Sequence, residues 1–482
     1  MTGPLLVVDI GTSGVRGSVV HPDATVTAVH YRRALPSSPA PGLVEFDPLA
    51  LADAARGVAR TALAEGGPVA AVGITNQRAS TVVWDRATGE PVGPGLGWQD
   101  LRTVGDCLVW QGEGLRFAPN ESATKAAHLL DAADPDRRRD LCVGTIDTWV
   151  AWQLSHGDLH VTDPSNAAVT GLLLPDASDW DDKRLDAMRI KRSALPRVVD
   201  TTGVLGTAAA LDGSPPIAAL AGDQQASLVG QGCVRPGLAK ITFGTGGMLD
   251  VCVGEERPES VRQGAHGTFP IVAWRDGAGV TWGVEAVMLA AGTNVEWLRD
   301  DLGIIDSAEA SNDVAAMCET TDGVVYVPAL LGLGTPIWDY GARGTLLGIT
   351  RGTGRSQVVR AVLEGVAHRG ADLVEAAEAD TGLALDRLRV DGGMTANATF
   401  VQAVADAAQR PVEVSPEREA TTLGAGFLAG LAVGTWGGWD DVAATWRPRT
   451  VVEPARALDR DRWREAVSRA AGWEPDLTAI SF

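Results

Sequence analysis

Short apolar runs alternate with helical patterns along the first half of the chain. Residues 5–10 and 17–20 have the apolar character of two strands joined by a turn, and residues 70–75 form another short apolar run. Between them, residues 48–63 carry small and apolar side chains at helical spacing. Alternating strands and helices are typical of an α/β domain, and we expect that class here.

The same alternation returns further along the chain. Residues 215–222 form an apolar run that ends at Asp223, and residues 224–229 have a helical pattern. A chain of 482 residues is too long for one ordinary core. We therefore expect two domains, residues 1–232 and residues 233–482.

Two further helices are predicted in the second half. Residues 356–381 repeat valine every fourth position, and Gly382 follows where a helix commonly ends. Residues 419–434 have a helical pattern rich in glycine and alanine. Side chains this small predict that another backbone packs closely against this helix.

A glycine-hydroxyl turn occurs twice, each time after an apolar run. Gly11-Thr12-Ser13-Gly14 follows the first strand, and Gly244-Thr245-Gly246 follows residues 241–243. Such turns present backbone N–H groups and a hydroxyl that suit a phosphate oxygen, although one alone is also ordinary hairpin chemistry. Two copies indicate a nucleotide held between two related domains. A strand at 388–390 followed by Gly392-Gly393 is a third candidate.

Composition narrows the possible partners. The net charge is −20 with a pI near 4.8, which argues against a nucleic-acid partner. Five scattered cysteines and seven scattered histidines indicate neither a disulfide framework nor a zinc site. No apolar run approaches the ~18 residues of a membrane span, and no signal peptide is visible. We expect a cytoplasmic protein with no membrane partner.

Several motifs together resemble the FGGY carbohydrate kinases, in that family's order along the chain. The family motifs are Asp9-Ile10-Gly11-Thr12-Ser13, Gly222-Asp223-Gln224-Gln225, Phe243-Gly244-Thr245-Gly246 and Asp391-Gly392-Gly393 with Asn397. Closer similarity to the glycerol kinase branch is carried by Gly73-Ile74-Thr75-Asn76-Gln77-Arg78, Trp98-Gln99 and Pro336-Ile337-Trp338-Asp339.

The resemblance implies two actin-like (ribonuclease H-like) domains with the active site in the cleft between them. It implies an enzyme that transfers the γ-phosphoryl group of ATP to a hydroxyl of a polyol or sugar. Asp223 would be the catalytic base, which agrees with a carboxylate at the end of an apolar run, although Asp is also a common helix cap. Asp9 would contact Mg²⁺, a hard cation that prefers carboxylate and water oxygens.

The nucleotide contacts implied by the resemblance come from both halves. The first turn would meet the phosphates through Gly11, Thr12, Ser13 and Arg16, and the second through Thr245 and Gly246. Further contacts with the nucleotide are implied for Gly292, Gly393 and Asn397. Glu296 stands where glycerol kinases often carry glutamine.

The acceptor site matches the family only in part. Arg78, Trp98, Asp223 and Gln224 are present, giving a cation, an aromatic wall, a carboxylate and an amide. Ala79, Asn120 and Met248 replace the glutamate, tyrosine and aromatic residue of typical glycerol kinases. Each replacement removes a hydrogen-bond partner or vacates space, so we expect a larger polyol or ketose, or weakened glycerol binding.

Two alternatives stay open at this point. Another FGGY specificity, such as a tetritol or a pentulose like xylulose, fits the replaced acceptor residues. A non-catalytic nucleotide-binding protein on the actin/Hsp70-like scaffold would share the phosphate turns, but it would not need Asp223. A homo-oligomer is possible, and no segment of the sequence identifies its interface.

Overall fold

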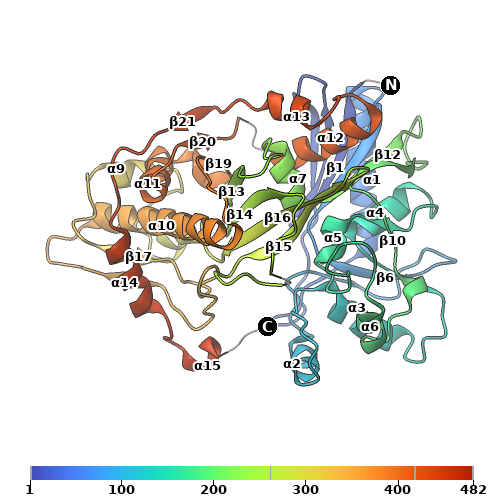
Figure 1. The fold of residues 1–482 in the computed structure, drawn as a ribbon, viewed down its shortest axis with the longest axis horizontal. Helices are drawn as coiled ribbons and strands as arrows, with labels where there is room; N and C mark the ends of the chain where they lie inside the picture. Colours follow the sequence, from blue (N-terminus) through green and yellow to red (C-terminus); the bar gives the residue numbers. More distant parts are fainter. Residues whose placement is uncertain (1–2, 261, 417–418, 480–482) are drawn as a thin grey trace.

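Two sheets lie side by side, one in each half of the chain. The computed structural model describes residues 3–260, 262–416 and 419–479. In Figure 1 the first half, in blue to green, lies on the right, and most of the second half lies on the left. This arrangement confirms the expected α/β class.

The first sheet contains six strands in the order β11-β12-β5-β1-β2-β3. Strands β1, β2 and β3 are consecutive and antiparallel, whereas β5 and β12 lie parallel to β1. The hairpin and the buried strand predicted from the apolar runs are thus confirmed. The strands are β1 (Leu5–Ile10), β2 (Gly14–Val20), β3 (Val26–Arg33), β5 (Ala71–Asn76), β11 (Thr202–Thr207) and β12 (Pro216–Gly222).

The second sheet repeats this plan in its central strands. Its order is β15-β16-β14-β13-β19-β20-β21, with β13, β14 and β16 antiparallel and β13, β19 and β20 parallel. The two turns noticed in the sequence therefore occupy equivalent places in two copies of one unit. The strands are β13 (Ala239–Phe243), β14 (Gly247–Gly254), β15 (Phe269–Asp276), β16 (Gly279–Met288), β19 (Leu388–Asp391), β20 (Val412–Val414) and β21 (Thr450–Val452).

Helices and small sheets surround the two large sheets. The small sheets pair β4 (Glu45–Phe46), β7 (Gly95–Leu96), β6 (Thr81–Asp85) and β8 (Leu141–Thr145), then β9 (Val161–Thr162) with β10 (Arg197–Val198), and β17 (Val325–Val327) with β18 (Thr345–Leu347). In the first half the helices are α1 (Pro48–Gly66), α2 (Val104–Gly112), α3 (Ser122–Ala133), α4 (Ile146–Leu154), α5 (Pro164–Ala168), α6 (Asp182–Ala187) and α7 (Asp223–Gly230). The second half contains α8 (Thr293–Glu296), α9 (Ala310–Ala316), α10 (Arg355–Thr381), α11 (Ala398–Ala408), α12 (Ala420–Val433), α13 (Trp439–Thr445), α14 (Arg460–Ala470) and α15 (Pro475–Thr478).

Local sequence signals set the ends of several helices. The Asp47 carboxylate accepts hydrogen bonds from the N–H groups of Leu49 and Ala50, and Pro48 occupies the first turn of α1. Helix α10 ends at Gly382, which is left-handed with φ 69°. The helices predicted over 48–63 and 356–381 are therefore confirmed.

Helix α12 leaves its own half and packs on the first sheet. It lies against β1, β5, β11 and β12 and crosses α7. A Cβ added at Gly424 would overlap the carbonyl of Ala226, and one at Gly230 would overlap the carbonyl of Ala420. Only glycine permits this approach, as predicted for residues 419–434. The first sheet thus has a layer supplied by the far end of the chain.

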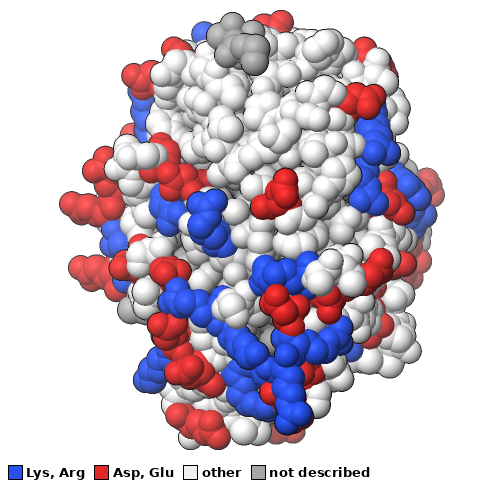
Figure 2. All heavy atoms as spheres, turned by 90° about the vertical axis from the view of Figure 1, so that its right-hand side faces the viewer, with Lys and Arg blue, Asp and Glu red and all other residues white. Residues whose placement is uncertain are grey.

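The surface carries both signs of charge despite the acidic total. Figure 2 shows Lys and Arg gathered on one part of the face, mixed with Asp and Glu, and a largely uncharged area elsewhere on that face. Within residues 3–260, 262–416 and 419–479, no helix is long and apolar enough to cross a membrane.

Candidate active site

Three parallel strands of the first sheet end at one edge, and most first-half site residues follow them. Asp9 near the end of β1 pairs with Thr75 of β5, and Gly222 of β12 pairs with Asn76. The carboxyl ends of parallel strands are the usual place for ligand sites in α/β sheets. Asp9, Arg78 and Asp223 are brought together at this edge.

The second glycine turn lies among three glycine-containing segments. The Gly292 N–H donates to the carbonyl of Gly244 over 2.8 Å, and a Cβ at Gly292 would lie 2.6 Å from that oxygen. Gly392 has φ 91°, and a Cβ there would overlap the Phe243 carbonyl. Glycine is therefore required where the ends of β13 and β19 meet the segment after β16.

Asp223 is the first residue of α7, directly after β12. Gly222 is the capping residue of this helix, so Asp223 does not occupy the capping position. Its Oδ1 accepts from the Gln224 N–H at 2.8 Å and lies 3.8 Å from Arg78 Nε. Burial raises the pKa of Asp223, and the nearby Arg78 charge opposes that rise. The result is a partly desolvated carboxylate with Arg78 as its strongest cationic neighbour and Lys240 as a second one.

Asp9 and Arg16 form a charged group beside the first turn. Arg16 Nη1 lies 3.3 Å from Asp9 Oδ2, and it also pairs with Glu419 from the second half. Burial raises the pKa of Asp9 to about 7, with further increases from Asp223 and Glu419, while Arg16 lowers it. An additional cation here would relieve the repulsion among these carboxylates.

The predicted aromatic wall touches the first phosphate turn. Trp98 Nε1 donates to Thr12 Oγ1 at 3.2 Å, and the indole is 40% exposed. The Trp98 N–H is itself bonded to Ser80 Oγ at 3.0 Å. Trp98 therefore links Ser80 to the first glycine turn, through its backbone N–H on one side and its indole on the other.

The three replaced acceptor residues occupy different settings. Ala79 is buried in a left-handed conformation with φ 63°, and its carbonyl accepts from Ser122 Oγ at 3.0 Å. Asn120 is exposed, and Met248 is half-buried on β14. None of these three side chains makes a side-chain hydrogen bond among the residues described.

In the described part of the chain, the side chains of Asn397 and Glu296, for which the resemblance implies contacts with the nucleotide, do not lie against the glycine turns through hydrogen bonds. Asn397 caps α11: its Oδ1 accepts from the Phe400 N–H at 2.9 Å, and its Nδ2 donates to Ser311 Oγ. Glu296 is exposed at the end of the short helix α8. Neither side chain contacts the glycine segments through a described hydrogen bond.

Three charged residues beneath the site were missed in the sequence. Lys240 Nζ donates to Gln224 Oε1 at 2.7 Å and lies 2.7 Å from Asp250 Oδ2. Glu285 lies 2.5 Å from Arg78 Nη2. Each of the three is the one charged residue in its strand, and that pattern was the available signal.

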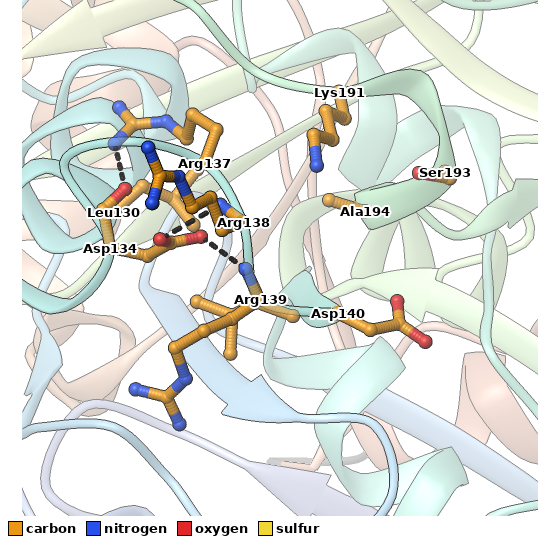
Figure 3. Close-up of a pocket in the computed structure, with 10 residues that line it drawn as sticks. Leu130, Asp134, Arg137, Arg138, Arg139, Asp140, Lys191, Ser193 and Ala194 are labelled. Atoms are coloured by element: carbon orange, nitrogen blue, oxygen red, sulfur yellow. Dashed lines mark hydrogen bonds between the residues drawn. The ribbon is translucent and has the colours of Figure 1, made fainter.

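A separate hollow of about 150 Å³ lies away from this edge, beside the end of α3. Arg137, Arg138, Arg139 and Lys191 line it together with Asp134 and Asp140, as Figure 3 shows. No residue implied in catalysis or nucleotide binding lines it, so the candidate site is the strand edge.

Family models match both halves of the chain. Residues 5–230 match the N-terminal domain, and residues 239–433 the C-terminal domain, of the FGGY family of carbohydrate kinases. The chain belongs to this family and is an ATP-dependent kinase of a polyol or sugar, with two domains of the actin-like fold. The resemblance stated from the motifs is thereby confirmed.

Within the family, the similarity points to the glycerol kinase branch. The chain is 41% identical to a glycerol kinase of Aromatoleum aromaticum, covering 97% of this chain and 99% of that protein. It is 39% identical to glycerol kinase 2 of Thermotoga maritima, in a match that covers 98% of this chain and 99% of that protein. The crystal structure of Plasmodium falciparum glycerol kinase with ADP aligns with TM-score 0.90 and 28% identity, covering 100% and 99%. These findings favour a glycerol kinase-like enzyme over a pentulose kinase or a non-catalytic binding protein.

Proposed function

We propose that the chain transfers the γ-phosphoryl group of Mg-ATP to a hydroxyl of glycerol or a somewhat larger polyol, with Asp223 as general base. The observation that carries this proposal is the position of Asp223 at the strand edge shared with the first phosphate turn. Arg78 beside it is a cation suited to acceptor hydroxyls, and Trp98 provides an apolar wall.

In this reaction the protein forms no covalent bond with the substrates, and it acts mainly by positioning them and stabilising charge. Asp223 accepts the hydroxyl proton as the acceptor oxygen bonds to the γ-phosphorus and the bond to the ADP oxygen breaks. Burial raises the pKa of Asp223, which makes its carboxylate a better proton acceptor, and the Arg78 charge opposes that rise by favouring the ionised form.

The phosphates of ATP would lie between the two glycine turns. Gly11, Thr12, Ser13 and Arg16 approach from the first half, and Thr245 and Gly246 from the second. Arg16 would exchange part of its contact with Glu419 for phosphate oxygens. The segments at Gly292, Glu296, Gly393 and Asn397 would flank the rest of the nucleotide, with Asn397 acting partly by holding α11 in place.

Mg²⁺ would be held by Asp9 together with water and phosphate oxygens. The Asp9 carboxylate is buried and has a raised pKa, which is the setting in which an added cation stabilises the ionised form. No cluster of three or more potential ligands occurs in the part of the chain that the structure describes. When bound, Mg²⁺ would neutralise charge on the transferred phosphoryl group.

The acceptor range follows from Ala79, Asn120 and Met248. None of them offers the hydrogen bond or aromatic surface that the typical glycerol kinase residue supplies, so the pocket would discriminate less sharply by size. We also propose a cytoplasmic location and a division of the chain near residue 232. We further propose that the chain forms a homo-oligomer.

The test is acceptor-dependent ADP release from Mg-ATP. Glycerol, four- and five-carbon polyols and pentuloses are compared for wild type and Asp223→Asn, with Mg-ADP affinity measured for both as a control of folding. We expect release with at least one polyol, lost in Asp223→Asn at unchanged ADP affinity. No release with any compound would refute the activity, and strong preference for glycerol alone would refute the wider pocket.

A further inference from the structure

Five ionisable side chains form one row across the second sheet. Directly opposed residues link Glu413 to Arg389, Arg389 to Lys240, Lys240 to Asp250, and Asp250 to Glu285. Opposed residues project from the same face of a sheet. All five are less than a tenth exposed. We call these five residues the charged row.

The opposite face of the same strands is apolar. Ile241, Leu249 and Val390 belong to the core that α10 and α11 cover. The charged row therefore projects toward the first half of the chain, where α7 packs against β14 and β15. A buried row of charges replaces the apolar contact expected between two packed layers.

The charged row binds the first half at three points. Glu285 pairs with Arg78, Lys240 donates to Gln224, and Arg389 donates to the carbonyl of Gln231. Gln224 is the second residue of α7, and Gln231 directly follows its last residue. Helix α7, which begins with Asp223, is thus held at both ends by the second sheet.

Charge balance within this buried group depends on cations outside it. The charged row contains three carboxylates and two cations, and Arg78 pairs with Glu285 at one end while Arg387 pairs with Glu413 at the other. Burial lowers the pKa of Lys240, but Asp250 and Asp391 more than offset this and keep it above its usual value. Removing one member of such a set leaves an uncompensated buried charge, which is costly.

The charged row also adjoins the nucleotide turn along the chain. Lys240 lies on β13, whose last residue, Phe243, is followed directly by Gly244 and Thr245. Asp250 lies near the start of β14, the strand that follows this turn. A displacement of the turn would therefore be carried by rigid strand backbone to the side chains that hold α7.

We propose that Lys240, Asp250 and Glu285 are positioning residues that hold Gln224 and Arg78 on either side of Asp223, coupling the nucleotide-binding strand to the catalytic base. This inference rests on the proposed role of Asp223. It gives the charged row a function in catalysis beyond its contribution to packing.

The charged residues that face Asp223 shift its pKa in opposite directions, and this difference can be tested. Arg78 has the largest effect and lowers the pKa of Asp223, and Lys240 lowers it further, whereas Asp250 raises it. Asp9 is a fourth charged neighbour, since Asp223 raises its pKa. Removing the charge of Lys240 should raise the pKa of Asp223, and removing that of Asp250 should lower it.

The experiment compares Lys240→Met, Lys240→Arg and Asp250→Asn with wild type. Lys183→Met, at an exposed position on α6, is the matched control. We expect Lys240→Met to lower kcat by about 10²-fold with little change in KM for ATP, because the base is misplaced while the turn remains. Lys240→Arg should retain more activity, and Lys183→Met should match wild type.

The pH dependence of kcat/KM for the acceptor separates positioning from general damage. We expect its acidic limb to move to higher pH in Lys240→Met and to lower pH in Asp250→Asn. Shifts in the same direction, or an unchanged kcat in Lys240→Met, would overturn the proposal. Circular dichroism and Mg-ADP affinity identify variants that fail to fold. If Lys240→Met fails to fold, the same pH profile is measured for Lys240→Arg.

A second readout does not need turnover. Protein labelled with ¹³C at the aspartate carboxyl carbons allows the titration of Asp223 to be followed directly, assigned by the resonance missing in Asp223→Asn. Opposite displacements in the two variants support the coupling even if wild type phosphorylates none of the acceptors. Inactive wild type would refute the proposed function, whereas equal titrations would refute the charged row's role.

Discussion

Substitution of Gly424 by alanine probes the crossing of α7 and α12 most directly. The added methyl group would overlap the Ala226 carbonyl oxygen and lie 2.6 Å from its carbon and 2.7 Å from the Gly230 nitrogen. Apolar contacts are comfortable near 3.5–4.0 Å, so the helices must separate by about 1–2 Å. All three atoms are backbone, so no side-chain rotation can relieve the overlap.

The expected cost follows from overpacking of a tight interface. Such insertions destabilise by about 1–3 kcal/mol, and a backbone obstacle favours the upper end of that range. Because α7 begins with Asp223, the same displacement should also lower kcat, by up to about 10²-fold. Stability and activity should therefore fall together.

Gly57→Ala is the matched control. Gly57 is exposed within α1, and an added Cβ would meet only the Arg32 guanidinium at 3.9 Å. Alanine there should stabilise by about 0.5–1 kcal/mol through helix propensity. Scanning calorimetry and acceptor-dependent ADP release are measured for both variants. Equal melting temperatures for Gly424→Ala and Gly57→Ala would refute the packing argument.

Three further predictions concern the site. The folded-state pKa of Asp9, about 7, lies above its ordinary value of 3.8, so its ionisation costs stability as pH rises from about 4 to 7. Asp9→Asn should therefore melt above wild type at pH 8 without Mg²⁺, with the difference shrinking toward pH 4; a constant difference would contradict this. Trp98→Phe removes the donor to Thr12 but keeps an aromatic wall, so kcat/KM for ATP should fall several-fold, as for one lost hydrogen bond, with KM for the acceptor nearly unchanged. An acceptor KM that rises as much as in Trp98→Ala would show that the indole N–H serves the acceptor. Ala79→Glu should raise the preference for glycerol over five-carbon polyols in competition assays, and an unchanged ratio would remove Ala79 from the specificity argument.

Local signals were sufficient for much of the fold. The glycine turns, the valine repeat of α10 and the small residues of α12 each depend on neighbours along the chain, and each was predicted correctly. The charged row depends instead on strand register, because Lys240, Asp250 and Glu285 become neighbours only when β13, β14 and β16 pair. No spacing in the sequence expresses that pairing.

The candidate site also divides into residues that local sequence signals identify and contacts that only the folded structure shows. Asp9 is the penultimate residue of β1, while Arg78 and Asp223 come after β5 and β12, so each lies near the end of an apolar run visible in the sequence. The parallel pairing that brings these ends to one edge is seen only in the structure. Asn397 combines both cases: its cap on α11 is a local contact with the Phe400 N–H, whereas its bond to Ser311 depends on packing that only the structure shows. Its implied contact with the nucleotide stays a prediction.

Because α12 packs on the first sheet, the core of that sheet can be completed only late in synthesis. Leu5 and Val7 of the first strand share a core with Leu423, Phe427 and Leu428, which the ribosome adds more than four hundred residues later. One face of the first sheet, on which α7 also packs, therefore stays incompletely covered until α12 emerges. A nascent chain released near residue 232 would expose this apolar face to water, and the late residues determine whether the earliest strands escape aggregation.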